Sequence, residues 1–298
     1  RPGLLKGDAV VDISDAVKGV AGRNGQETME GIISNFESLR PALQAQLESG
    51  KATPLSQVKL RSPLPRPGKI MMMGTNYLEF TGGAPFPIFG FLKSPEAILD
   101  TGGTIELPPD NFVICHHEAE FGVVVGKKGH RISEANAFHH IFGYTCCVDV
   151  SARYFPDLAN TLLGKSYMGF HPLGPCIVTK DELSDPYASR IRLWVNGELR
   201  QDFGNDDMGH KIPECIAYFS ARTMLNPGDV FSLGTNHQGL GALQDGDHVE
   251  MEITGIGRIT FDITDPLKRS WPKGIDRSIG ESVKTRLLAH QAELAAKK

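Results

Sequence analysis

Short runs rich in Val, Ile, Phe and Thr follow one another from about residue 69 to about residue 265, and this succession limits the fold more than any other feature. The 33 glycines and 19 prolines of the chain are concentrated between these runs. Such runs are typical of strands, and Gly and Pro between them are typical of turns. The sequence therefore predicts a β-rich α+β fold and disfavours an all-helical one.

The first part of the chain has a different pattern. Apolar residues recur at helical spacing in residues 28–36 and 38–47, which predicts two helices. Residues 60–68 contain three prolines and a glycine, which predict an extended connector. We therefore expect a small N-terminal subdomain over residues 1–60.

The rest of the chain divides into a body and a tail. Residues 68–270 hold the strand-like runs and one helical pattern, at residues 212–224, and we expect them to form a β-rich domain of the size of a catalytic domain. We expect residues 271–298 to form a helical tail that packs back onto the body or mediates oligomerisation. The apolar side of its predicted helix, residues 278–298, consists of Val283, Leu287, Leu288 and Leu294.

The charge balance excludes several classes of partner. The chain has 31 Lys and Arg against 35 Asp and Glu, a net charge of −4, which does not suit a nucleic-acid-binding protein. No apolar run approaches the roughly 20 residues that cross a bilayer, and the first residues lack the apolar core of a signal peptide. We therefore expect a cytoplasmic protein that binds neither nucleic acid nor membrane. The five cysteines form no Cys-x-x-Cys pair, so we expect buried thiols.

Residues 113–126 are the most informative run. On a strand, successive side chains point to opposite faces, so His116, Glu118 and Glu120 share one face. Two carboxylates this close on one face repel each other unless solvent or a cation neutralises them. A divalent metal ion explains the pair, and a solvated sheet face is the alternative. The other face is nearly apolar and consists of Val113, Cys115, His117, Ala119, Phe121, Val123 and Val125.

A third carboxylate, Asp149, lies near the end of the strand-like run of residues 141–150. Bulky apolar residues occupy the even positions of that run, which places Asp149 on the opposite face. An Asp at such a position also serves as a cap for the following turn, and this alternative stays open. Taken together, Glu118, Glu120 and Asp149 predict a site of hard oxygen ligands, which suits Mg²⁺ or Mn²⁺ better than zinc.

Two basic residues and a glycine-rich loop follow. Arg153 and Lys165 can each bind an anionic substrate or stabilise charge beside the metal, although an isolated basic residue is more often a surface charge. Residues 234–241 place polar side chains among glycines after a strand-like run. Loops of this kind let backbone N–H groups approach a carboxylate or an oxyanion, and an ordinary hairpin connection is the alternative.

Seven ordered blocks, within about residues 68–265, resemble the fumarylacetoacetate hydrolase superfamily. Seven blocks in this order are far more specific than any one of them. The blocks are Gly74-Thr75-Asn76-Tyr77, Phe91-Leu92-Lys93, the run from His116 to Val124, Gly143-Tyr144 with the run from Asp149 to Arg153, Gly164-Lys165-Ser166, Val195-Asn196-Gly197-Glu198 and Gly234-Thr235.

The resemblance implies a mixed β-roll fold that commonly forms homodimers. It also implies a metal held by Glu118, Glu120 and Asp149, in agreement with the argument from strand faces. Substrates of the family are typically 2-oxo acids or 1,3-diketo acids. Such a metal acts as a Lewis acid that stabilises the enolate formed when a C–C bond breaks or a proton leaves.

The resemblance also implies roles for residues around the metal. Lys165 is expected to contact the substrate or an intermediate. Thr235 and Arg153 are expected to hold a substrate carboxylate or oxo group. Tyr77 and Lys93, which lie in the first two blocks, are assigned to substrate binding on the same ground.

The chain departs from the family after the first block. Family hydrolases usually carry there a His and, three residues on, a Glu, which together activate the attacking water on a lid. Phe80 and Gly83 occupy these positions here. Glu79, His237 and His116 are therefore the alternative acid–base candidates, and a packing role stays open for each histidine.

We therefore expect a Mg²⁺- or Mn²⁺-dependent enzyme that hydrolyses a C–C bond in a 2-oxo or 1,3-diketo carboxylic acid, such as an acylpyruvate, in a catabolic pathway. Lys165, Glu79 and His237 would carry the chemistry. Without the usual dyad, the same site can instead end in decarboxylation or dehydration, so a lyase is the alternative. A third hypothesis is a silent family member that binds metal and an acid ligand without turnover.

Overall fold

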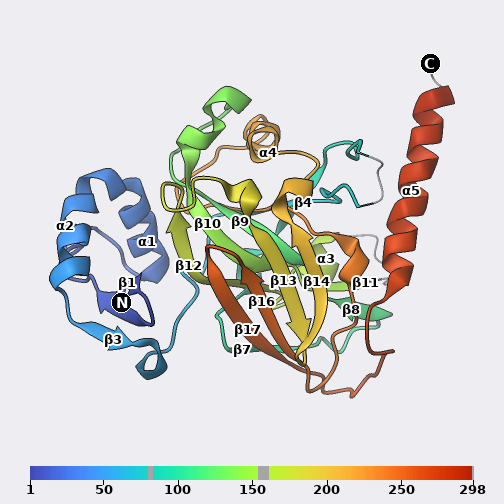
Figure 1. Cartoon of the computed structure of the whole chain (residues 1–298), viewed down its shortest axis with the longest axis horizontal. Helices are drawn as coiled ribbons and strands as arrows, with labels where there is room; N and C mark the ends of the chain where they lie inside the picture. The colour runs from blue at the N-terminus through green and yellow to red at the C-terminus, as the bar shows by residue number, and fades with distance from the viewer. Residues whose placement is uncertain (80–82, 154–160, 297–298) are drawn as a thin grey trace.

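The computed structural model describes residues 1–79, 83–153 and 161–296 of the chain. Its centre is built from sheets, with the N-terminal helices at one side and the C-terminal helix at the opposite side (Figure 1). The described strands form sheets of seven, five, three and two strands. The expected β-rich α+β architecture is confirmed.

The N-terminal part contains a small antiparallel sheet and two helices around an apolar cluster of its own. The first helix begins where the Asn24 side chain accepts a hydrogen bond from the Glu27 amide at 3.0 Å. Both predicted helices are present, whereas the strands escaped prediction because they are short and mostly exposed. The division at residue 60 stays a prediction. The cluster consists of Ile13, Val17, Ile32 and Leu43. The elements are β1 (Gly3–Lys6), β2 (Ala9–Asp12), α1 (Gly25–Ser34), α2 (Phe36–Ser49), β3 (Ala52–Pro54) and the 3-10 helix η1 (Leu55–Gln57).

The seven-stranded sheet holds the deepest part of the core. Its order is β5-β4-β15-β9-β10-β12-β6, with β9 antiparallel to both β10 and β15 and with β15 parallel to β4. Every residue of β9 is buried, as expected for a strand covered on both faces. The strands are β4 (Ile70–Met73), β5 (Gly90–Lys93), β6 (Ile98–Leu99), β9 (Ala119–Val125), β10 (Ile141–Val148), β12 (His171–Thr179) and β15 (Val230–Ser232).

The five-stranded sheet has the order β14-β13-β16-β17-β7. Its β13–β14 hairpin turns at Asn196 and Gly197, whose φ angles of 54° and 79° suit a tight Asn-Gly turn. The strands are β7 (Gly103–Glu106), β13 (Arg190–Val195), β14 (Glu198–Gly204), β16 (His248–Ile253) and β17 (Gly257–Thr264).

The prediction of a single strand over residues 113–126 is wrong. The chain forms β8 (Ile114–His116), leaves the strand at His117 and Glu118, and resumes as β9. The break arises because the two halves pair in different sheets: β8 pairs with β11 (Ser151–Arg153), whereas β9 joins the seven-stranded sheet.

Helices and short turns connect the sheets. The helix expected over residues 212–224 ends earlier, because the amides of Arg222 and Thr223 both bond back to the carbonyl oxygen of Phe219. In the C-terminal helix Val283 is buried, whereas Leu288 is 54% exposed. The side chains of Leu287 and Leu294 lie outside the described residues. The remaining elements are α3 (Thr161–Lys165), α4 (Ile212–Ser220), α5 (Arg277–Ala296) and the 3-10 helices η2 (Pro95–Ala97), η3 (Glu134–His140), η4 (Pro186–Ala188), η5 (Asn205–Asp207) and η6 (His237–Gly239).

The cysteines are all free thiols, four of them buried and Cys176 half-buried, as expected. In the described part of the chain, no helix has the length and apolarity needed to cross a membrane.

Candidate metal centre

Three buried carboxylates converge where β9 pairs with β10. Glu120 lies on β9, opposite Cys147 of β10. Glu118 just precedes β9 and Asp149 just follows β10, and the Asp149 amide donates to the Glu118 carbonyl oxygen at 2.8 Å. One carboxylate oxygen from each of the three residues lies within 4.8 Å of the others, and each residue is at most 5% exposed. The three predicted metal ligands are therefore brought together.

The electrostatics of this group fit a cation. Burial and the charges of Asp149 and Glu118 raise the pKa of Glu120 to about 8. A carboxyl group placed where its charged form is disfavoured either takes up a proton or needs a nearby positive charge. The donors are hard oxygens without a thiolate, which is the set preferred by Mg²⁺ and Mn²⁺. The group can therefore hold a divalent cation.

Lys165 and Arg153 contact two of these carboxylates. The Lys165 ammonium donates to Asp149 Oδ2 at 2.5 Å, to Glu118 Oε2 at 2.9 Å and to Ser151 Oγ at 2.6 Å. The Arg153 guanidinium donates to Glu118 Oε1. Burial opposes the charge on Glu118, but Lys165 and Arg153 hold the pKa of Glu118 well below its usual range. Burial also disfavours the ammonium, yet Asp149 and Glu118 raise the pKa of Lys165, which stays cationic.

Lys93 completes a set of three cations around three carboxylates. Its ammonium is fully buried and donates at 2.6 Å both to Asp149 Oδ1 and to the carbonyl oxygen of Phe170. Burial lowers the pKa of Lys93, although Asp149 opposes that shift. Lys93 is thus held by the same carboxylate as Lys165.

His116 lies behind Arg153. Arg153 Nε donates to His116 Nδ1 at 2.7 Å, and His116 Nε2 lies 3.0 Å from Asp276 Oδ2. Burial and the neighbouring Arg153 lower the pKa of His116 to about 4, so the ring is neutral. Asp276, which sequence reasoning missed, is 160 residues from His116 along the chain. No local pattern indicates a contact of that span.

Glu79 and His237 form a second pair. Glu79 Oε1 accepts from the His237 amide at 2.8 Å and lies 2.7 Å from His237 Nδ1. Glu79 Oε2 is buried without a hydrogen-bond partner among the described residues. His237 contributes to the low pKa of Glu118, so this pair lies within electrostatic reach of the carboxylates. Phe80, one of the two rewritten lid positions, lies outside the described residues.

Thr235 is fixed by a glutamine that sequence reasoning also missed. The Thr235 hydroxyl donates to the carbonyl oxygen of Ala119, between the two glutamates, at 2.7 Å. Gln201 Nε2 donates to Thr235 Oγ1 at 2.8 Å, and Gln201 Oε1 accepts from the Ala119 amide at 3.0 Å. Gln201 shares the buried face of β14 with Phe203, and an amide on an apolar face was the available signal.

Tyr77 is buried and its hydroxyl donates to Asn205 Oδ1 at 2.7 Å. Its ring packs edge-on against Phe203, with 4.9 Å between the ring centroids. Its assignment to substrate binding stays a prediction.

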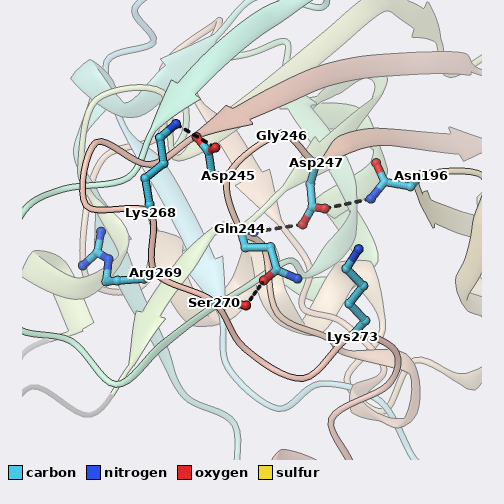
Figure 2. Close-up of a pocket in the computed structure, with 9 residues that line it drawn as sticks. All are labelled: Asn196, Gln244, Asp245, Gly246, Asp247, Lys268, Arg269, Ser270 and Lys273. Carbon is cyan, nitrogen blue, oxygen red and sulfur yellow. Dashed lines mark hydrogen bonds and ion pairs between the residues drawn. The ribbon is translucent and has the colours of Figure 1, made fainter.

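A separate polar pocket of about 320 Å³ lies elsewhere, and none of the predicted site residues lines it. Figure 2 shows that its charged side chains are mostly paired within the pocket: Lys268 with Asp245, and Asp247 with Asn196 and Gln244. The pocket is therefore a separate feature from the carboxylate group.

Comparison with protein families gives a match over residues 66–264 to the family described as fumarylacetoacetate (FAA) hydrolase, C-terminal. The chain is 38% identical over 219 residues to a mitochondrial oxaloacetate tautomerase of Xenopus laevis, covering 69% of this chain and 68% of that protein. It is 36% identical over 208 residues to the 4-hydroxyphenylacetate degradation bifunctional isomerase/decarboxylase of Salmonella dublin. That match covers 67% of this chain but only 48% of the longer relative.

Among solved structures, maleylpyruvate hydrolase from Sphingobium sp. SYK-6 is similar, with a TM-score of 0.80 and 32% identity over 88% of this chain and 96% of that one. The same enzyme in complex with manganese(II) ion and pyruvate gives a TM-score of 0.78 at 32% identity, over 88% of this chain and 95% of that one. The matched segment, which contains the three carboxylates and all the cations around them, places this chain in the fumarylacetoacetate hydrolase family.

Proposed function

We propose that this chain is a divalent-metal-dependent enzyme that hydrolyses a C–C bond in a 2-oxo or 1,3-diketo carboxylic acid of the acylpyruvate type. The observation that carries the proposal is the buried group of Glu118, Glu120 and Asp149 with cations in contact with it. A structural site does not need three crowded carboxylates in a buried place, since such charges are expensive to desolvate.

The three carboxylates would hold Mg²⁺ or Mn²⁺. When bound, the metal supplies a Lewis acid that polarises the oxygens of a chelating 2-oxo acid. The similar maleylpyruvate hydrolase is described in complex with manganese(II) ion and pyruvate. That complex supports both the metal and the substrate class proposed for this chain.

Formal charges support an anionic substrate. With all three carboxylates ionised, the negative charges of Glu118, Glu120 and Asp149 equal in number the positive charges of Lys93, Arg153 and Lys165. A divalent cation would leave a surplus of two positive charges in a buried place. A dianionic diketo acid, or the enolate of a monoanionic one, would neutralise that surplus.

Lys165 would stabilise the negative charge that develops on the substrate, because it stays cationic and is the least buried of the ammonium groups here. Arg153 and Thr235 would hold the substrate carboxylate. Lys93 and Tyr77 would line the substrate site, where hydrogen bonds to protein groups hold their polar atoms in place.

Glu79 and His237 would replace the missing dyad in activating water. An ionised carboxylate only accepts hydrogen bonds, so Glu79 requires the proton of the histidine ring to lie on Nδ1. His237 Nε2 is then the atom that takes a proton from water. The hydroxide adds to the carbonyl carbon, the C–C bond breaks to give an acid and an enolate, and the enolate is protonated to the 2-oxo acid.

A lyase that uses the same residues is the second candidate. It is favoured by Phe80 and Gly83 at the positions of the usual water-activating pair, since decarboxylation and dehydration need no activated water. The bifunctional isomerase/decarboxylase and the oxaloacetate tautomerase among the relatives fit enolate chemistry of this kind. Homodimer formation and a cytoplasmic location stay predictions.

The test is a titration with Mg²⁺ and Mn²⁺, with and without EDTA, on acylpyruvates, oxaloacetate and 2-oxo-3-deoxy sugar acids, with the products identified. Pyruvate plus a second acid from an acylpyruvate is the expected result. Loss of CO₂ or water without hydrolysis would favour the lyase. Binding of metal without any turnover would favour the silent family member.

A further inference from the structure

A chain of hydrogen bonds links the C-terminal segment to the candidate metal centre. Asp276 contacts His116, His116 contacts Arg153, and Arg153 contacts Glu118. His116 is fully buried between its two partners. These hydrogen bonds connect Asp276, just before α5, to Glu118, a proposed metal ligand. They pass through His116 of β8 and Arg153 of β11.

The direction of these hydrogen bonds is fixed by chemistry. A guanidinium donates and never accepts, so the contact from Arg153 Nε requires a lone pair on His116 Nδ1. The proton of the neutral ring must then lie on Nε2, where Asp276 Oδ2 accepts it. Without that acceptor the proton can move to Nδ1, where it would face Arg153 and break the contact. Asp276 therefore selects the tautomer that lets His116 hold Arg153.

The segment that carries Asp276 is itself well anchored. We name residues 271–276 the C-terminal strap. The Asp276 amide donates to the Leu240 carbonyl oxygen at 2.7 Å, and Trp271 Nε1 donates to the Val113 carbonyl oxygen at 2.6 Å. Arg200 donates to the Gly274 carbonyl oxygen. The strap thus contacts two segments that carry candidate site residues. One contact lies just before β8, and the other lies in the loop that follows Thr235 and His237.

We propose that Asp276 is a positioning residue of the metal centre, which acts through His116 to set the orientation of Arg153 on Glu118. This inference rests on the proposed metal-dependent function. It gives the C-terminal strap a role in the chemistry, although the family match ends at residue 264.

Asp276 also has a purely structural task, which the test must separate. Its Oδ1 accepts from the Ser278 amide at 2.9 Å and so caps α5. Asp276→Ala removes both contacts at once. His116→Leu interrupts the series of hydrogen bonds but leaves the cap of α5 in place. Asp262→Ala is the matched control, because Asp262 contacts His248 at 2.7 Å in an exposed His–Asp pair.

The measurement is the Kd of Mn²⁺, read from the electron paramagnetic resonance signal of the free ion in the absence of substrate, together with kcat and KM on the best acylpyruvate. Loss of a group that orients a metal ligand typically weakens metal affinity by about 10- to 100-fold. We expect a loss in this range for Asp276→Ala and for His116→Leu, and little change for Asp262→Ala. The double variant Asp276→Ala/His116→Leu should lose no more than either single one.

A folded Asp276→Ala variant whose Mn²⁺ affinity equals that of the wild type would overturn the inference, as would full additivity in the double variant. If Asp276→Ala does not fold, His116→Leu carries the same decision. If the wild type binds no Mn²⁺, the proposed function itself fails and the inference with it.

Discussion

The candidate metal centre and the polar pocket are both rich in charged side chains, and they differ in depth. In the metal centre, three carboxylates that are at most 5% exposed contact Lys93, Arg153 and Lys165. In the polar pocket of Figure 2, Lys268 is 72% exposed and pairs with Asp245, which is 30% exposed. The pocket is a cavity of about 320 Å³, whereas the buried group has a carboxyl group whose pKa is raised to about 8.

The difference indicates that crowding of buried like charges, rather than the volume of a cavity, distinguishes the candidate metal centre. Exposed ion pairs are screened by water and contribute little. Buried carboxylates that face each other lose solvation and repel, so they persist only where a cation offsets these unfavourable free energies. Four changes test this comparison.

Glu120→Gln should have the largest effect. It keeps the shape of the side chain but removes the charge that a divalent cation needs, and the Lewis-acid contribution is worth several kcal/mol. We expect kcat to fall about 10³-fold or more, with Mn²⁺ binding lost in the same variant. Glu250→Gln, which changes a carboxylate on β16 that pairs with Arg258, serves as the control. Retention of turnover by Glu120→Gln would remove the basis of the comparison.

Glu79→Gln should come next. General acid–base catalysis contributes typically about 10²- to 10⁴-fold, so we expect a loss of about 10²-fold in kcat for hydrolysis, with Mn²⁺ affinity unchanged. Glu214→Gln provides a matched change in a His–Glu pair, because Glu214 lies 3.6 Å from His210 in the described structure and its side chain is 40% exposed. An undiminished hydrolytic kcat in Glu79→Gln would assign water activation to another group.

His171→Leu tests the buried surroundings of the site through stability. Burial, with smaller contributions from Lys93 and Lys165, holds the pKa of His171 well below 6.5, and neither ring nitrogen has a partner among the described residues. The unfolded chain then binds a proton that the folded chain does not, so stability is present above pH 6.5 and is lost as pH falls. Each histidine of this kind contributes up to about 1.4 kcal/mol per pH unit to that loss.

We therefore expect the free energy of unfolding of His171→Leu to fall less steeply between pH 7 and pH 5 than that of the wild type. Urea unfolding at several pH values measures this slope. His139→Leu, at an exposed position, is the control. Equal slopes for His171→Leu and wild type would show that the pKa of His171 is not lowered in the folded chain.

Lys268→Ala in the polar pocket should have the smallest effect. Exposed ion pairs contribute about 0–1 kcal/mol, so we expect a change in stability within that range and an unchanged kcat/KM. Thermal unfolding and the acylpyruvate assay check both values. A tenfold loss of kcat/KM would give the pocket a functional role and invert the comparison.

Several features of the fold and site were predictable from local sequence. Asn196 and Gly197 favour a turn by their own conformational preferences, and the alternating pattern around Glu120 predicted a strand, which the structure shows to be buried. The inference that Glu118 and Glu120 share a site is correct, although the single strand on which it was based is not. Their side chains meet because the chain changes sheets just before β9, not because a continuous strand alternates there.

The sequence by itself determined the β-rich fold class, the family resemblance and the identity of the three carboxylates, because these depend on residue type and on short-range periodicity. Only the tertiary structure decided what surrounds them: Lys93 on Asp149, 56 residues away, Gln201 beside Ala119, and Asp276 behind His116. Local patterns carry no record of such contacts, because sheet pairing and chain reversal bring together segments whose spacing in the sequence is arbitrary. The arrangement of charges around the three carboxylates is therefore set by topology.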